Sequence, residues 1–191
     1  SFDRDGNIVA ASPSHVMVFD PAGRYLRSLR LVMAHTPDSA DIRWGGLTPP
    51  AYQSVNALRA LPDGRIAVFA YNSPLNIYEP ALGRLAVPGG DASFPLPPGN
   101  HWQMAADGAG TVYVGVTEAA SVGVWKFRPD GAPAYEFAAG TTNRLCADNP
   151  RGIALDAAGN VYVAAADGKI RRYRPDGALA AEWNTAIPPG P

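Results

Sequence analysis

His35, Asp38 and Asp41 are the side chains whose types and spacing come nearest to a metal site. They follow one another at intervals of three residues in the long segment 32–54, and an imidazole nitrogen with two carboxylates can bind a divalent cation. No glycine stands where a calcium-binding loop needs its sharp turn. We therefore favour the alternative, a polar loop with chance spacing, and predict neither a metal site nor a cofactor.

Arg43, Trp44 and Tyr52, in the same segment, suit contact with another molecule. Exposed arginine, tryptophan and tyrosine side chains dominate the energetics of protein interfaces. The alternative is structural, with Trp44 and Tyr52 holding the long segment down on neighbouring strands. All three residues are candidate binding residues.

Four further candidates stand near the starts of expected strands or in loops: His101, Trp102, Arg144 and Arg151. The alternatives are that Trp102 packs between neighbouring sheets and that Arg144 is a solvated loop charge. The sequence contains no Gly-x-Ser-x-Gly elbow, phosphate loop or HExxH motif, and these motifs carry the chemistry of hydrolases, nucleotide-binding proteins and zinc proteases. We predict no catalytic residue.

The segment 150–183 shows which elements position these residues. Short apolar or β-branched runs predict four strands, at 152–155, 161–165, 169–174 and 178–183. The intervening turns carry Gly159, Gly168 and the run Pro175-Asp176-Gly177, which suit tight turns because glycine accepts positive φ and proline presets φ. The segment therefore predicts a four-stranded antiparallel meander.

The same two glycine turns recur along the chain. First-turn glycines are Gly6, Gly64, Gly110 and Gly159, separated by 58, 46 and 49 residues, and each is followed by a second turn 17 to 21 residues later. Self-similarity at this period is typical of a radial array of four-stranded blades. Expected strands are 2–3, 8–11, 15–19, 25–31, 55–61, 66–71, 75–79, 84–87, 101–105, 112–116, 122–128 and 134–137, besides the four above.

The motif Pro-x-Gly-Ile-Ala-x-Asp-x-x-Gly-Asn-Val-Tyr-Val-Ala at 150–164, with the Pro-Asp-Gly turn after it, resembles the NHL repeat of bacterial six-bladed β-propellers in the TolB-like superfamily. The resemblance implies an all-β propeller with blades at about 1–31, 55–87, 101–137 and 152–183. It implies a single domain over 1–191, interrupted by the long loop 32–54. Many functions share the repeat.

The ends of the chain favour part of a five- or six-bladed ring over a closed four-bladed ring. Residues 1–3 supply only the tail of an inner strand, and the Pro-rich residues 185–191 do not suit a sheet interior. We expect an excised piece of a longer protein.

Composition limits the classes of partner. The net charge is −1, which argues against nucleic acid, since phosphate binding depends on excess Lys and Arg. The lone Cys146 excludes an internal disulfide and a CxxC motif. No apolar run is long enough to span a membrane. The Ala-, Arg-, Gly- and Pro-rich composition and the resemblance suggest a bacterial protein that is periplasmic, cell-surface or secreted.

The sequence favours a non-catalytic scaffold that binds a protein, peptide or glycan. Loops at 12–14, 32–54, 72–74, 88–100, 117–121, 139–149 and 166–168 are expected at one end of the blades, opposite the glycine turns, and binding residues concentrate on such loops. The alternative is a metal-dependent lactonase or esterase. The resemblance implies Asn where this chain has Arg151, so the enzymatic site would be incomplete in this chain.

Overall fold

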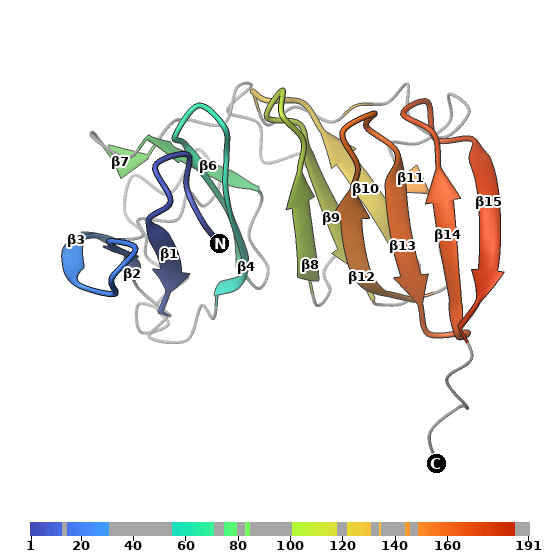
Figure 1. The fold of residues 1–191 in the computed structure, drawn as a ribbon, viewed down its shortest axis with the longest axis horizontal. Coiled ribbons are helices and arrows are strands. Elements are labelled where there is room, and N and C mark those ends of the chain that lie inside the picture. Colours follow the sequence, from blue (N-terminus) through green and yellow to red (C-terminus); the bar gives the residue numbers. More distant parts are fainter. Residues whose placement is uncertain are drawn as a thin grey trace, which may run out of the picture. The chain divides into compact units, whose positions relative to one another are not determined.

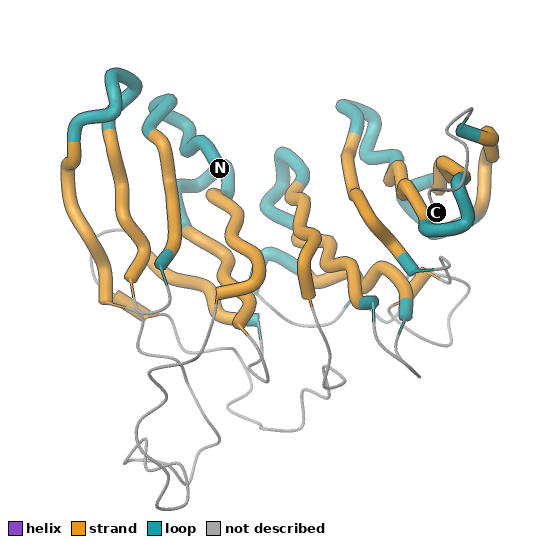
Figure 2. Tube along the Cα trace, turned by 90° about the horizontal axis from the view of Figure 1, so that it is seen from below, coloured by secondary structure: helices purple, strands orange, loops and turns teal. Residues whose placement is uncertain are grey.

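The computed structural model describes residues 1–12, 15–30, 55–70, 75–79, 83–84, 101–117, 122–130, 134, 144–145 and 149–185. These residues form four antiparallel β-sheets (Figure 1). Figure 2 shows strands and loops but no helix in the described part of the chain. The all-β prediction is confirmed. The chain divides into two compact units, Ser1–Pro98 with Asp130–Ala132, and Gly99–Pro129 with Pro133–Pro191.

Unit 1 contains two sheets. The first has the order β1-β2-β3, and an antiparallel bridge between Phe2 and Ile8 extends it at the β1 edge. The second has the order β4-β5-β6-β7. The strands are β1 (Ile8–Ala11), β2 (His15–Phe19), β3 (Tyr25–Arg30), β4 (Val55–Ala60), β5 (Ile66–Ala70), β6 (Asn76–Glu79) and β7 (Gly83–Arg84).

Unit 2 also contains two sheets, with the orders β8-β9-β10-β11 and β12-β13-β14-β15. The strands are β8 (His101–Ala106), β9 (Val112–Val116), β10 (Gly123–Phe127), β11 (Arg144–Leu145), β12 (Pro150–Leu155), β13 (Val161–Ala165), β14 (Lys169–Tyr173) and β15 (Leu179–Asn184). Each sheet is a meander in chain order, as the repeat predicts.

The predicted strands agree with the observed ones to within two residues, apart from the outer strands of the second and third sheets. The strand expected at 84–87 is β7 (Gly83–Arg84), and 85–87 lie outside the described residues. The neighbour of β10 is β11, which pairs Leu145 with Val124, although the sequence analysis places residues 144–145 in a loop. Of the strand expected at 134–137, Ala134 donates its amide hydrogen to the Lys126 carbonyl, and 135–137 lie outside the described residues. A two-residue strand has no recognisable periodicity, so β11 could not be predicted from the sequence.

All four sheets share one register. The second residue of the strand after each first glycine turn pairs with the residue that directly precedes an aromatic residue on the next strand: Val9 with Val18, Ala67 with Ile77, Tyr113 with Lys126 and Tyr162 with Arg172. Because side chains alternate across a strand, this register places equivalent residues on equivalent faces. The four repeats are therefore structurally equivalent sheets.

An aspartate three residues before the glycine stabilises most of the tight turns. Asp156 Oδ1 accepts hydrogen bonds from the amides of Ala158 and Asn160, at 3.0 and 2.9 Å, while Gly159 adopts φ 78°, a conformation that glycine accepts without a Cβ clash. Asp3, Asp20 and Asp107 bind the amides of their own turns in the same way. Hydrogen bonds from Asn160 lower the pKa of Asp156.

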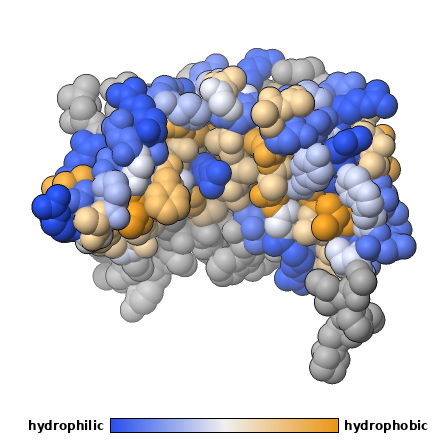
Figure 3. Space-filling model, in the orientation of Figure 1, coloured by the Kyte–Doolittle hydropathy of each residue, from blue (hydrophilic) through white to orange (hydrophobic). Residues whose placement is uncertain are grey.

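Each unit has its own core between its two sheets. In unit 1, Val9 and Val16 pack against Ile66 and Val68. In unit 2, the buried residues of the core are Tyr113, Val124, Leu145, Val161, Val163 and Tyr173. Burying a valine, leucine or aromatic side chain contributes about 1.5–3 kcal/mol, so sheet-on-sheet packing holds each unit together. Hydrophilic residues cover much of the surface that faces the viewer in Figure 3.

Candidate functional site

The inner strands of three sheets begin with a β-bulge at the same position. In β8, His101 pairs with Val116 and Gln103 with Gly115, which leaves Trp102 as the extra residue. In β12, Pro150 pairs with Ala165 and Gly152 with Ala164, which leaves Arg151. The extra residue in β4 is Asn56. A bulge changes the direction of a side chain and is common beside functional sites.

Two of these bulges lie next to each other in unit 2. A Cβ atom added to Gly115 would come within 3.1 Å of Gln103 Cβ, 3.2 Å of Ile153 Cδ1 and 3.4 Å of Pro150 Cγ. Gln103, which follows Trp102, and Pro150, which precedes Arg151, therefore both lie against Gly115. Because Arg151 is exposed, this end of unit 2 presents a cation beside the Trp102 bulge.

The approach to Arg151 is held by a strained corner. Asn149 has φ 45°, a left-handed conformation that asparagine tolerates better than most residues. Its carbonyl accepts a hydrogen bond from the Ala166 amide at 3.1 Å, which attaches the corner to the turn between β13 and β14. The Asn149 Oδ1 atom is buried and has no hydrogen-bond partner among the described residues.

An ion-pair network fixes that turn. Arg171 binds the carboxylates of Asp167 and Glu182, and Lys169 Nζ lies 2.6 Å from Glu182 Oε1. Hydrogen bonding from Arg171 lowers the pKa of Asp167, and hydrogen bonding from Lys169 lowers the pKa of Glu182. Thr185 closes the network, because its hydroxyl donates to the Gly168 carbonyl at 2.6 Å. These charges support the loop end of the sheet.

The predicted site residues fall into three groups. His101, Trp102 and Arg151 come together at the loop end of unit 2, where β8 and β12 start. Arg144 is not brought to them, because it pairs with Trp125 on β11, the strand at the opposite edge of the sheet from β8. Arg43, Trp44 and Tyr52 lie outside the described residues, as do His35, Asp38 and Asp41.

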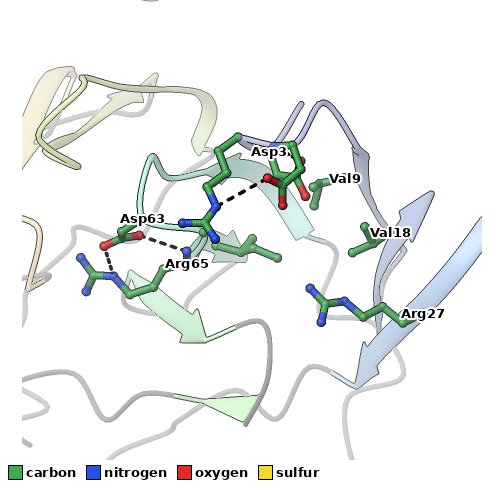
Figure 4. Close-up of a pocket in the computed structure, with 10 residues that line it drawn as sticks. Asp3, Val9, Val18, Arg27, Asp63 and Arg65 are labelled. Atoms are coloured by element: carbon green, nitrogen blue, oxygen red, sulfur yellow. Dashed lines mark hydrogen bonds and ion pairs between the residues drawn. The ribbon is translucent and has the colours of Figure 1, made fainter. Parts of the chain in front are cut away.

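A pocket of about 380 Å³ lies in unit 1, between the first turns of its two sheets. Figure 4 shows Arg27 extending from β3 toward Asp3, with Asp63 and Arg65 on the facing turn. Binding residues are expected from the sequence at the loop end, opposite the glycine turns, so this pocket is not predicted. A comparison of the repeats in the sequence could have indicated the pocket, because Val9 and Val18 take positions that larger residues occupy in unit 2.

Within the described ranges, no three His, Cys, Asp or Glu side chains are grouped as a metal site would require. The same ranges contain no helix of the length and apolarity of a membrane span.

The chain matches solved structures of the same fold. It aligns with BBS1N in complex with ARL6DN, solved from mercury- and lead-soaked crystals, at TM-scores of 0.61 and 0.63. Both alignments cover 94% of this chain, at 14% sequence identity. It also aligns with a Bacteroides caccae protein of unknown function at a TM-score of 0.53 and 13% identity. The fold is a β-propeller.

The chain spans about half the length of these solved propeller chains, 50% of each BBS1N chain and 58% of the Bacteroides caccae chain. No family model matches this propeller. No curated protein matches it either.

Proposed function

We propose that the protein is a non-catalytic β-propeller scaffold that binds a protein, peptide or glycan through the loop end of its blades. The observation that carries this proposal is the pair of adjacent bulges in unit 2, one of which presents Arg151 to solvent. A rigid sheet that aims an arginine beside a tryptophan position offers residue types that are enriched at binding hot spots. Among the three candidate ligands, an acidic peptide suits Arg151 best.

The structural neighbours support the proposal at the level of the fold. BBS1N was crystallised in complex with ARL6DN, so a protein of this fold takes part in a protein complex. Propellers carry many functions on one architecture. The support for a binding site on this chain therefore comes from Arg151 and the bulges, not from the neighbour.

We further propose that the blades are of the NHL type, within a five- or six-bladed ring of an extracytoplasmic bacterial protein. The NHL assignment is supported by the motif at 150–164, whose glycines and strands fall where the NHL pattern implies. The location rests on the resemblance and on composition. Fractionation of a bacterium that expresses the full-length protein tests the location.

The binding proposal is tested by selecting peptides from a random displayed library on the intact chain. We expect acidic peptides, whose affinity falls about tenfold in Arg151→Glu, since a hot-spot contact contributes more than about 1 kcal/mol. Trp102→Ala is expected to have a similar effect. Arg174→Glu is the matched control, because Arg174 is an exposed arginine at the opposite end of the same sheet.

Affinities that are equal for Arg151→Glu and Arg174→Glu would contradict the proposal. Thermal unfolding of each variant separates loss of the contact from loss of the fold.

A further inference from the structure

The pocket in unit 1 lies beside Val9, at the position where both sheets of unit 2 have a tyrosine and the second sheet of unit 1 has Ala67. Its walls come from the turn at Asp3, from Val9, Val18 and Arg27 of the first sheet, and from the turn that leads into Ile66 of the second sheet. Its volume of about 380 Å³ lies in the range of small-molecule sites, about 300–1,000 Å³.

Two substitutions between repeats open this pocket. Val9 and Val18 pair with each other in the register that joins Tyr113 to Lys126 in unit 2. Tyr113 is 1% exposed in the core between the two sheets, and Lys126 Nζ lies 5.7 Å from the centre of its ring. Replacing a tyrosine and a lysine by two valines removes a ring and a long side chain from the equivalent space in unit 1.

The repeats also show how a ring is held at this position. In the fourth sheet, Tyr162 takes the position of Val9, and its hydroxyl donates to Asp156 Oδ2 at 3.1 Å. Asp3 is the turn aspartate that corresponds to Asp156. The pocket in unit 1 thus keeps the aspartate but has no tyrosine.

The charges of the pocket leave one cation available. Arg65 Nε lies 2.6 Å from Asp63 Oδ2, and Arg4 Nε lies 3.7 Å from Asp5 Oδ1. Arg27 points into the pocket in Figure 4. Within the described part of the chain, the Arg27 side chain forms neither a hydrogen bond nor an ion pair, and its charge interacts at longer range with the Asp3 carboxylate. Asp3 is already occupied by the Asp5 and Asn7 amides and by the Asn7 side chain.

We propose that this pocket binds a small aromatic carboxylate, with its ring in the space above Val9 and Val18 and its carboxylate on Arg27. The ring takes the place of the tyrosine that the unit 2 sheets supply themselves, and the carboxylate supplies a hydrogen-bond acceptor that the Arg27 side chain does not have among the described residues. Arginine suits this role because its planar guanidinium binds carboxylates through two parallel hydrogen bonds. The site is separate from Arg151 and independent of the binding proposed there.

Calorimetric titration of the whole chain with 4-hydroxyphenylacetate tests the proposal. We expect a dissociation constant on the order of 1 mM, as suits a ligand of this size. Tyramine carries the same ring with an ammonium group in place of the carboxylate, and it should bind at least about tenfold more weakly because the cation faces Arg27. Equal affinity for the two compounds would overturn the proposal.

Two variants locate the site. Arg27→Gln should weaken 4-hydroxyphenylacetate binding about tenfold, whereas Arg174→Gln, an exposed arginine of unit 2, should leave binding unchanged. Val9→Tyr introduces the residue that both sheets of unit 2 have at the equivalent position, so it should abolish binding and raise the melting temperature. If Val9→Tyr fails to fold, Arg27→Gln still decides, because its side chain is exposed. Two results would refute the site: an affinity that is unchanged in Arg27→Gln, or no binding of 4-hydroxyphenylacetate at a concentration about 10-fold above the expected dissociation constant.

Discussion

At the scale of single residues, aspartates shape the turns on which the sheets depend. Asp3, Asp20 and Asp156 accept amide hydrogen bonds from their own turns, and each has a lowered pKa. For Asp20, the largest cause is the hydrogen bond from the Arg24 amide. Because these carboxylates bind protons less readily in the folded chain, the turns are stabilised by the charged form.

Acidification should therefore weaken the fold through these turns. The contribution of Asp156 is fully present above the pKa of the unfolded chain and is lost as the pH falls through the lower pKa of the folded state. Asp156→Asn should be less stable than the parent protein at neutral pH, and the difference should shrink as the pH falls. Urea unfolding between pH 7 and pH 2 measures it, and a constant difference would contradict the assignment.

Tyr113 should give the opposite pH dependence. Burial, with a smaller effect from the charge of Asp107, raises its pKa to about 12. The neutral phenol stabilises the fold below the unfolded-state pKa of 10, and this contribution is lost as the pH rises toward 12. Tyr113→Phe should therefore lose less stability than the parent protein between pH 9 and pH 12 in an alkaline unfolding series.

Gly115 is the residue at which the two bulged strands meet. An added Cβ would stand 3.1 Å from Gln103 Cβ and 3.2 Å from Ile153 Cδ1, so Gly115→Ala should destabilise unit 2 by about 1–2 kcal/mol through overpacking. Gly108→Ala is the matched control, because nothing lies within 4 Å of its added Cβ. Chemical denaturation compares the two, and equal stabilities would show that the strands are not in close contact.

At the scale of elements, the short strand β11 contributes more than its length indicates. Leu145 is 1% exposed and belongs to the core of unit 2, although residues 144–145 are the whole of the strand. The third sheet therefore depends on β11 for packing as well as for its outer edge.

Leu145→Ala should cost about 2–5 kcal/mol, the usual range for a buried leucine. Leu179→Ala offers a comparison on the outer strand of the fourth sheet, where the side chain is 54% exposed. It should change the free energy of unfolding by less than about 0.5 kcal/mol. Similar losses for the two variants in urea denaturation would show that β11 does not pack into the core.

The sequence predicts most of the elements and little of what joins them. Gly6, Gly64, Gly110 and Gly159 mark the turns because only a few residue types accept positive φ, and all four adopt it. The bulges at Trp102 and Arg151 leave no comparable signal, since an extra residue shifts the register without changing the residue types. Likewise, the pocket beside Val9 results from packing between two sheets, which a pattern along one strand does not report.

At the scale of the whole molecule, the account depends on the equivalence of the four sheets. Val9 and Val18 line the pocket in the first sheet. The equivalent positions hold Tyr113 and Lys126 in the third sheet and Tyr162 and Arg172 in the fourth. A shift of one residue in the register of a sheet moves its side chains to the opposite face. Both the pocket and the bulged site therefore depend on this register.

Cross-strand nuclear Overhauser effects measure this register most directly. The account predicts contacts of one kind between the backbone protons of the equivalent pairs in all four sheets: Val9 and Val18, Ala67 and Ile77, Tyr113 and Lys126, Tyr162 and Arg172. Contacts displaced by one residue in any sheet, or missing from one of them, would contradict it.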